Sequence, residues 1–164
     1  MRQPVQVLVY PVRLMDSEWN YLLFHRVPLP KLGLPSFWQG VTGGLEGDES
    51  LELAAKRELL EETGLVSSQI NPIGFSYSFP VQDEWHHLYA SGVQEIVEHV
   101  FVALFQVGQE PILSIEHDES KWCRKEEALE LLKYPGNIEG LKRCAVFLES
   151  HNNAMHTDAD KPRR

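Results

Sequence analysis

Residues 43–65, with the sequence GGLEGDESLELAAKRELLEETGL, constrain the fold of this chain more than any other stretch. Asp48 and Ser50 are both able to cap the free N–H groups at the N-terminus of a helix. Gly64 is the residue type best suited to the left-handed position that ends a helix. The stretch therefore predicts a helix that begins near Asp48 or Ser50, ends at about Thr63, and lies between two loops.

Three glutamates share one side of this predicted helix. At about 100° per residue, Glu58, Glu61 and Glu62 fall within an arc of roughly 100°. In a partly buried site at an effective dielectric near 20, each like-charge pair at this spacing would cost on the order of 3 kcal/mol, against a few tenths in open water. The cluster is therefore either an ordinary solvated helix face or a set of ligands around a cation. Carboxylate oxygens suit Mg²⁺ or Mn²⁺, so the second interpretation predicts one of these ions as the cofactor.

The order of residues around the glutamates identifies the chain as a member of a known family. It matches every fixed position of the Nudix hydrolase pattern G-x5-E-x7-R-E-U-x-E-E-x-G-U, in which U is a bulky aliphatic residue. A match of this length in a loop–helix–loop context is far more specific than a short glycine motif. The matching residues are Gly43, Glu49, Arg57, Glu58, Leu59, Glu61, Glu62, Gly64 and Leu65.

This resemblance implies a fold, a reaction and a role for each residue of the motif. The fold would be a Nudix-type α/β/α sandwich with a mixed sheet, and the reaction would be metal-dependent hydrolysis of a phosphoanhydride bond. The three glutamates would hold the metal, and the first or the last of them would deprotonate the attacking water. Arg57 and Glu49 would form an ion pair that orients the helix. Gly43 and Gly44 would let the backbone turn tightly next to the substrate phosphates.

Short runs rich in aliphatic and aromatic residues predict strands on both sides of the helix. These runs are residues 5–10, 21–25, 37–42 (ended by the two glycines), 70–79 and 97–105, with weaker candidates at 112–115 and 121–123. Amphipathic spacing predicts two further helices at 126–132 and 138–149. The pattern is that of one α/β domain over residues 1–149, followed by a polar tail over 150–164 that is expected to be disordered.

The charge and the apolar content of the chain limit its partners. The formal net charge of −9, without a basic stripe, predicts repulsion of nucleic acid and of anionic membranes. A polyphosphate substrate would then need a cation between itself and the protein. No apolar run is long enough to span a bilayer and the N-terminus lacks a signal peptide, so a cytoplasmic location is expected. Cys123 and Cys144 lack a C-x-x-C spacing and are expected to be buried thiols.

A second resemblance extends over most of the chain. Residues 37–44, FWQGVTGG, are similar to the F-W-Q-x-V-T-G segment of the Nudix enzymes that cleave dihydroneopterin triphosphate. The runs HLYASGV and EHVF that follow resemble the R-Y-A-P-G-V and E-x-W-F segments of that subfamily, and the later E-H and K-W pairs resemble its ending. The departures are His87, Ser91 and Val100, which replace Arg, Pro and Trp where the base or pterin would lie.

This second resemblance implies a metal ligand outside the helix and several contacts with the substrate. Glu116 would be the extra ligand, although an acidic surface turn is the alternative interpretation of its sequence. Glu98 is a rival for the ligand role because it lies at the start of a predicted strand and directly precedes residues 99–105. Arg26, Thr42 and Arg2 would contact the substrate.

The expected reaction converts a nucleoside or pterin triphosphate to its monophosphate and pyrophosphate, catalysed by a monomer or homodimer. One alternative within enzymes is hydrolysis of dinucleoside polyphosphates or nucleotide sugars. Another is a non-catalytic Nudix domain that senses a ligand. Domains of that kind usually lose catalytic glutamates, whereas this sequence retains all three.

Overall fold

A mixed seven-stranded sheet forms the centre of the molecule in the computed structural model, which describes residues 1–151. The strand order is β3-β2-β1-β6-β5, with β4 along β1 and β7 along β2. The β1 and β6 strands run parallel and the other pairs are antiparallel. The strands are β1 (Val5–Met15), β2 (Glu18–Arg26), β3 (Phe37–Gln39), β4 (Val41–Gly44), β5 (Gln69–Pro80), β6 (Glu95–Leu104) and β7 (His117–Arg124).

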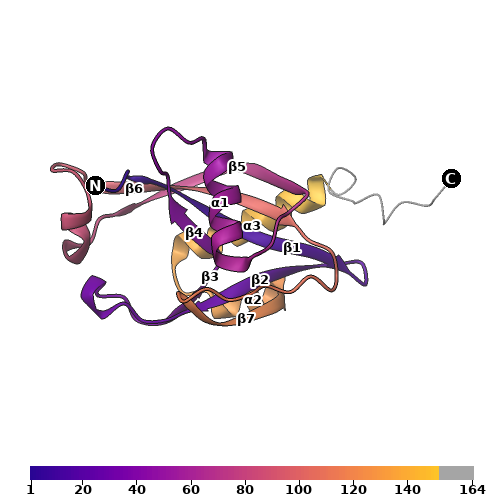
Figure 1. The fold of residues 1–164 in the computed structure, drawn as a ribbon. Helices are drawn as coiled ribbons and strands as arrows, with labels where there is room; N and C mark the ends of the chain where they lie inside the picture. Colours follow the sequence, from indigo (N-terminus) through magenta and orange to yellow (C-terminus); the bar gives the residue numbers. More distant parts are fainter. Residues whose placement is uncertain (152–164) are drawn as a thin grey trace.

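Helices cover both faces of this sheet. Figure 1 shows α1 (Leu51–Thr63) in front of the sheet and α2 (Lys125–Leu131) and α3 (Pro135–Ser150) behind it. Side chains alternate along β1, so its residues 7 and 9 pack with α1 while residues 8 and 10 pack with α3. The predicted α/β/α sandwich with a mixed sheet is therefore confirmed.

The ends of α1 follow from two local residues. The Ser50 Oγ accepts a hydrogen bond from the Leu53 N–H at 3.1 Å, so Ser50 and not Asp48 is the N-cap. Gly64 ends the helix in the left-handed conformation, with φ of 69°, and its N–H donates to the Leu60 carbonyl. The loop–helix–loop prediction is confirmed at both ends.

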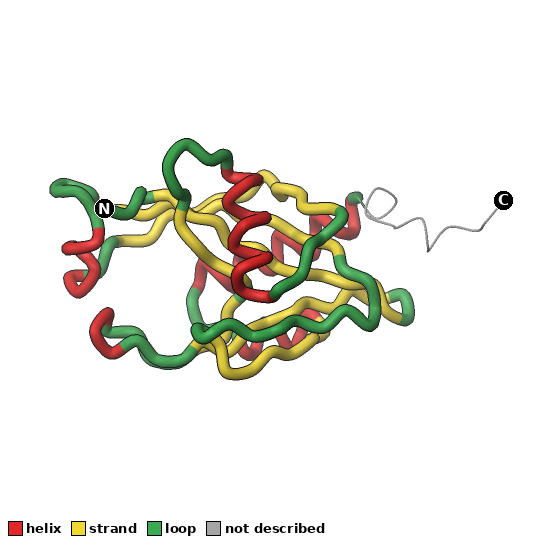
Figure 2. Tube along the Cα trace, viewed as in Figure 1, coloured by secondary structure: helices red, strands yellow, loops and turns green. Residues whose placement is uncertain are grey.

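The sheet divides into two arms because β1 and β2 pair along only part of their length. Their register joins residues 12–15 to residues 18–21. Beyond that, β4 lies along β1 and β3 lies along β2. The chain crosses from one arm to the other at Gly40, where a Cβ atom would meet the Val9 carbonyl oxygen at 2.8 Å. Figures 1 and 2 show the two arms extending to the left, with the 3-10 helices η1 (Pro30–Leu32) and η2 (Asp83–Leu88) near their ends.

Two strand predictions need correction. The single strand predicted at 37–42 is two strands with different partners, and Gly43 and Gly44 belong to β4 instead of ending a strand. The segment 112–115 is not a strand. It lies against the end of α1, where the Ile112 N–H donates to the Thr63 carbonyl at 2.8 Å, so its backbone is used to cover a helix terminus.

The remaining expectations concern the cysteines, the membrane and the tail. Cys123 and Cys144 are buried and free, as expected. None of the helices within residues 1–151 has the length and apolarity needed to cross a bilayer. The tail was predicted to begin at Ser150, which is the last residue of α3, and from residue 152 onward it lies outside the described residues.

Candidate active site

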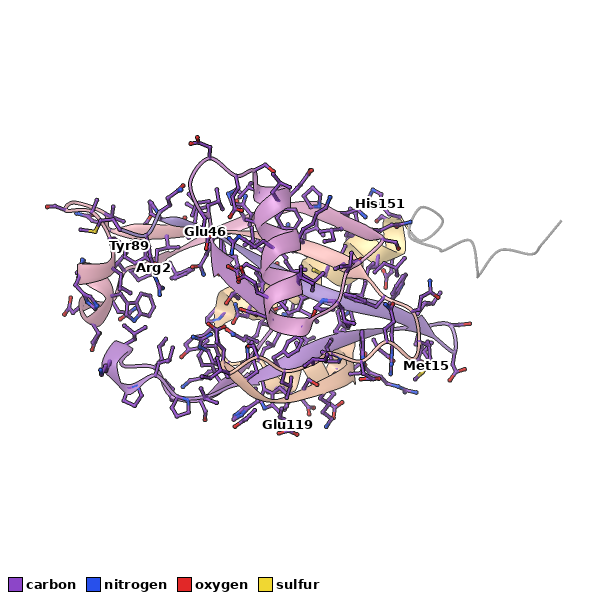
Figure 3. All side chains as sticks on the ribbon, viewed as in Figure 1. Arg2, Met15, Glu46, Tyr89, Glu119 and His151 are labelled. Atoms are coloured by element: carbon purple, nitrogen blue, oxygen red, sulfur yellow. The ribbon has the colours of Figure 1, made fainter. Side chains whose placement is uncertain are left out.

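A cleft of about 810 Å³ lies between the two arms of the sheet and receives side chains from both. Figure 3 shows Arg2, Tyr89 and Glu46 together on the upper arm, beside the opening. The Arg2 N–H donates to the Leu88 carbonyl at 2.7 Å, which ties the N-terminus to η2. All of the residues predicted to contact substrate line this cleft, namely Arg2, Arg26, Thr42, Gly43 and Gly44.

Three of the four predicted metal ligands also line the cleft. Glu58 and Glu62 reach it from α1, and Glu116 reaches it from the loop before β7. That loop is held by the Val27 N–H, which donates to the Glu116 carbonyl at 3.0 Å. Arg26 Nη1 lies 3.4 Å from Glu116 Oε2, so an arginine accompanies the carboxylates. Of the two candidates for the extra ligand, Glu116 therefore lies beside the helix carboxylates, whereas Glu98 belongs to a separate group of hydrogen-bonded side chains.

Glu61 is placed differently from the other two helix glutamates. Its side chain is 56% exposed and does not line the cleft, whereas the Glu58 side chain is 12% exposed and Glu62 is 4% exposed. Glu61 Oε2 lies 3.4 Å from Arg57 Nη1 at the rim of the site. Of the three carboxylates expected to enter one site, Glu58 and Glu62 line the cleft and Glu61 does not.

Burial raises the pKa of both helix carboxyl groups that line the cleft, those of Glu58 and Glu62. Desolvation raises the pKa of Glu62 to about 10, and the neighbouring Glu116 adds to the shift. Desolvation also raises the pKa of Glu58 to about 7, against the opposing effect of Arg57. The Glu62 Oε2 atom is buried and has no hydrogen-bond partner within the described residues. A divalent cation fits this site, because it would pair the free oxygen and stabilise the ionised carboxylates.

In this structure Glu58 is paired with an arginine of its own helix. Among residues 1–151, no three His, Cys, Asp or Glu side chains have the geometry of a preformed metal site. Arg57 Nη1 instead lies 2.8 Å from Glu58 Oε1.

Arg57 joins α1 to the loop before it. Its Nη2 and Nε atoms donate to the two carboxylate oxygens of Glu49 at 2.5 and 3.1 Å. The Nη2 atom also donates to the Gly44 carbonyl at 2.8 Å. These bonds lower the pKa of Glu49 and raise that of Arg57, so the pair stays charged. The predicted Arg57–Glu49 ion pair is present, and its role in orienting the helix stays a prediction.

Gly43 brings β4 into direct contact with the helix. A Cβ atom at this position would lie 1.9 Å from the Glu58 Cδ atom. At Gly44 the nearest heavy atom to such a Cβ is the Val5 carbonyl oxygen at 3.9 Å. The first glycine therefore provides the space that the Glu58 carboxyl occupies, whereas the second leaves room toward the cleft.

A second polar group in the cleft was not found by sequence reasoning. Gln6 Nε2 and the Tyr77 hydroxyl donate to the two carboxylate oxygens of Glu98, and Asn137 Nδ2 donates to the Tyr77 oxygen at 2.9 Å. All four residues line the cleft, and Glu98 is 2% exposed. The one local signal was a glutamine and a glutamate in otherwise apolar strands. Their partners come from distant elements, which a single sequence does not connect.

The burial of Glu98 predicts a pH dependence of stability. Desolvation raises its pKa from 4.5 to about 7 in the folded protein, so the folded state binds the extra proton between these values. The free energy of unfolding therefore falls as the pH rises from 4.5 to 7, by about 3 kcal/mol for this group at about 1.4 kcal/mol per pH unit. Denaturant unfolding of the wild type and of Glu98→Gln from pH 4 to pH 8 isolates this contribution as a difference. A pH-independent difference between the two proteins would contradict it.

Known proteins share both the sequence pattern and this architecture. The NUDIX domain model matches residues 2–144. The chain is 34% identical over 113 residues to the dihydroneopterin triphosphate diphosphatase of Haemophilus influenzae, an alignment that covers 66% of this chain and 71% of that protein. It is 34% identical over 109 residues to the RNA pyrophosphohydrolase of Caulobacter vibrioides, with 60% and 62% covered. The structure of the dihydroneopterin triphosphate pyrophosphohydrolase of Escherichia coli has a TM-score of 0.73 and 26% identity, covering 88% of this chain and 97% of that one.

The sandwich fold, the complete motif on α1 and these similarities define the class of the protein. The chain belongs to the NUDIX domain family. It is a Nudix hydrolase, similar along most of its length to diphosphatases and pyrophosphohydrolases.

Proposed function

We propose that this protein hydrolyses a nucleoside or pterin triphosphate to the monophosphate and pyrophosphate, and that it requires Mg²⁺ or Mn²⁺. The observation that carries the proposal is the convergence of Glu58, Glu62 and Glu116 in one cleft that also contains Arg26 and Arg2. Two of these carboxylates are buried, and oxygen ligands that converge in one cleft suit a divalent cation, while the arginines suit the phosphates that remain outside its coordination.

Each residue of the site has a task in this proposal. A metal ion held by Glu58, Glu62 and Glu116 would neutralise phosphate charge and lower the pKa of a bound water. Glu58 or Glu62 would take the proton of the attacking water. Arg57, bonded to Glu49 and to the Gly44 carbonyl, fixes the helix against β4. Glu61, at the rim, would help to hold a second ion.

The substrate-binding residues divide between the two arms. Arg26 and Thr42 lie near the carboxylates, and Gly44 presents open backbone to the cleft. The cleft is also lined by aromatic side chains, which provide flat apolar surface for a base or pterin ring. These aromatic residues are Phe37, Phe79, Trp85, Tyr89 and Tyr134. The names of the relatives from Haemophilus influenzae and Escherichia coli support a pterin triphosphate as substrate.

The test is a hydrolysis screen with Mg²⁺ and with Mn²⁺. The substrates are the four dNTPs, dihydroneopterin triphosphate, 5′-triphosphorylated RNA, a diadenosine polyphosphate and a nucleotide sugar. We expect pyrophosphate to appear directly from a small triphosphate and to disappear with EDTA. Orthophosphate without pyrophosphate, or a preference for the dinucleotide, the RNA or the sugar, would contradict the proposal.

Other expectations of the sequence belong to the same proposal. We expect residues 1–149 to act as one domain, in the cytoplasm, as a monomer or homodimer. Size-exclusion chromatography with light scattering measures the last of these directly.

A further inference from the structure

We propose that Glu98 determines the specificity of this enzyme by accepting two hydrogen bonds from a ring that carries an N–H and an exocyclic amino group side by side. Guanine and pterin rings both present this pair of donors, which belongs to their shared 2-amino-oxo edge. The inference deepens the proposed triphosphate hydrolysis and rests on it, since it assigns the ring end of the same substrate.

The sheet register places Glu98 on the same arm of the sheet as Gly44, two strands away from it. Gly44, Gln6, Glu98 and Tyr77 face one another in successive strands β4, β1, β6 and β5. Neighbouring strands are about 4.7–4.9 Å apart, so the Glu98 backbone lies roughly 10 Å from that of Gly44. The Gly44 carbonyl accepts a hydrogen bond from Arg57 of the catalytic motif. This row of residues therefore leads from that motif to the part of the cleft that we assign to the ring of the substrate.

The neighbours of Glu98 hold its carboxylate as an acceptor. Gln6 Nε2 donates to one carboxylate oxygen and the Tyr77 hydroxyl donates to the other. The Tyr77 oxygen accepts from Asn137, so the tyrosine proton is left for Glu98. An ionised carboxylate offers about four acceptor positions, and these bonds use two of them. The others remain for a ligand in the cleft that Glu98 lines.

The hydrogen-bond partners of the Glu98 carboxylate are unusual for a purely structural role. The partners that the structure gives it are neutral donors, whereas buried charges in proteins are normally paired with a cation or a metal. Two adjacent N–H donors of a ligand would complete its hydrogen bonding. Adenine presents an acceptor nitrogen at the corresponding edge, so it would leave the carboxylate facing another acceptor, which is costly in a buried site.

The structure also couples this carboxylate to the wall of the cleft. A Cβ atom at Gly136 would lie 2.1 Å from the Tyr77 Cε2 atom, so Tyr77 is packed tightly between β6 and the start of α3. The Tyr10 hydroxyl donates to the Asn137 carbonyl at 2.7 Å and anchors the same turn. Glu98 therefore has a fixed position, as selective hydrogen bonding to a ring requires.

The experiment compares substrates that differ by single groups, at a pH well above 7 so that Glu98 is ionised. The kcat/KM values of the wild type and of Glu98→Gln are measured with dGTP, dITP, dATP and dihydroneopterin triphosphate. The dITP ring keeps the N–H and lacks the amino group. We expect the wild type to prefer dGTP over dITP by about tenfold or more, the scale of one hydrogen bond to a charged group. In Glu98→Gln this ratio should approach one, and the rates with dGTP and with the pterin should both fall about 10- to 100-fold.

Glu95→Gln is the matched control, since Glu95 lies on the same strand, is exposed, and is outside the cleft. It should keep the wild-type ratio of dGTP to dITP. A tenfold ratio that persists in Glu98→Gln, or an equal loss with all four substrates, would overturn the inference. If Glu98→Gln does not fold, the wild-type ratio decides, and a value near one overturns it.

Failure of the proposed function would look different from failure of this inference. A wild type that hydrolyses triphosphates without distinguishing dGTP from dITP contradicts the role of Glu98 alone. A wild type that hydrolyses no triphosphate contradicts the proposed function. In that second case, calorimetric titration with dGMP and dIMP still tests Glu98, and equal affinities for the two would overturn its role.

Discussion

Replacing Glu62 by glutamine should leave the protein folded and lower its rate of hydrolysis by about three orders of magnitude or more. The amide cannot neutralise a cation, and the loss of several kcal/mol of transition-state stabilisation corresponds to about tenfold for each 1.4 kcal/mol. The fold should tolerate the change because the pKa of Glu62 is raised to about 10, so the metal-free protein already holds a neutral side chain there.

The measurements are kcat with Mg²⁺ and the thermal midpoint with and without the ion. The wild type should gain thermal stability from Mg²⁺, because an ion that binds the folded state stabilises it, and the variant should gain less. Glu52→Gln is the control, since Glu52 lies on the exposed face of the same helix. Wild-type turnover in Glu62→Gln would exclude the metal-binding role of this carboxyl.

Replacing Gly43 by alanine should lower the rate by about two orders of magnitude or more without any change to an ionisable group. The added Cβ would lie 1.9 Å from the Glu58 Cδ atom, far inside van der Waals contact, so the Glu58 side chain must move away from β4. Misplacement of a catalytic group by about 1 Å is enough to cost on the order of a hundredfold in rate.

The neighbouring glycine provides the comparison for this second variant. In Gly44→Ala the added Cβ has no heavy atom closer than 3.9 Å, so Glu58 keeps its place. We expect a smaller loss of rate in Gly44→Ala, arising from contact with the substrate, and a near-normal dependence of the rate on Mg²⁺ concentration. Gly43→Ala should need more Mg²⁺ to reach half its maximal rate. Equal losses and equal Mg²⁺ dependence in the two variants would show that crowding of Glu58 is not the cause.

The helix α1 could be predicted because its signals are local. The cap at Ser50, the left-handed Gly64 and the spacing of the glutamates all lie within one stretch of sequence. The position of Glu61 could not be predicted in the same way. An ideal helix gives the angle between side chains, but the rotation of the helix against the sheet decides which of them are buried, and that rotation depends on Ala54 and Leu59 packing with β1.

The remainder of the site depends on contacts between distant segments. The row that contains Glu98 joins β4, β1, β6 and β5, and its register follows from a parallel pairing of β1 with β6 that the sequence does not reveal. The division of the predicted strand at 37–42 into β3 and β4 was also missed, because the change of partner strand at Gly40 depends on a close approach of Gly40 to Val9. Composition and periodicity describe single elements and carry no information about such approaches.

The crossing of the chain at Gly40 has a consequence for the redesign of this enzyme. It joins an arm with β1 to an arm with β2, and η1 and η2 lie toward the ends of these arms, away from α1. Insertions or substitutions in residues 30–36 or 82–94 would therefore alter the opening through which a ring enters, without a change to the glutamates of the helix. Libraries confined to these two segments offer a route to new substrate preferences on an unchanged hydrolytic apparatus.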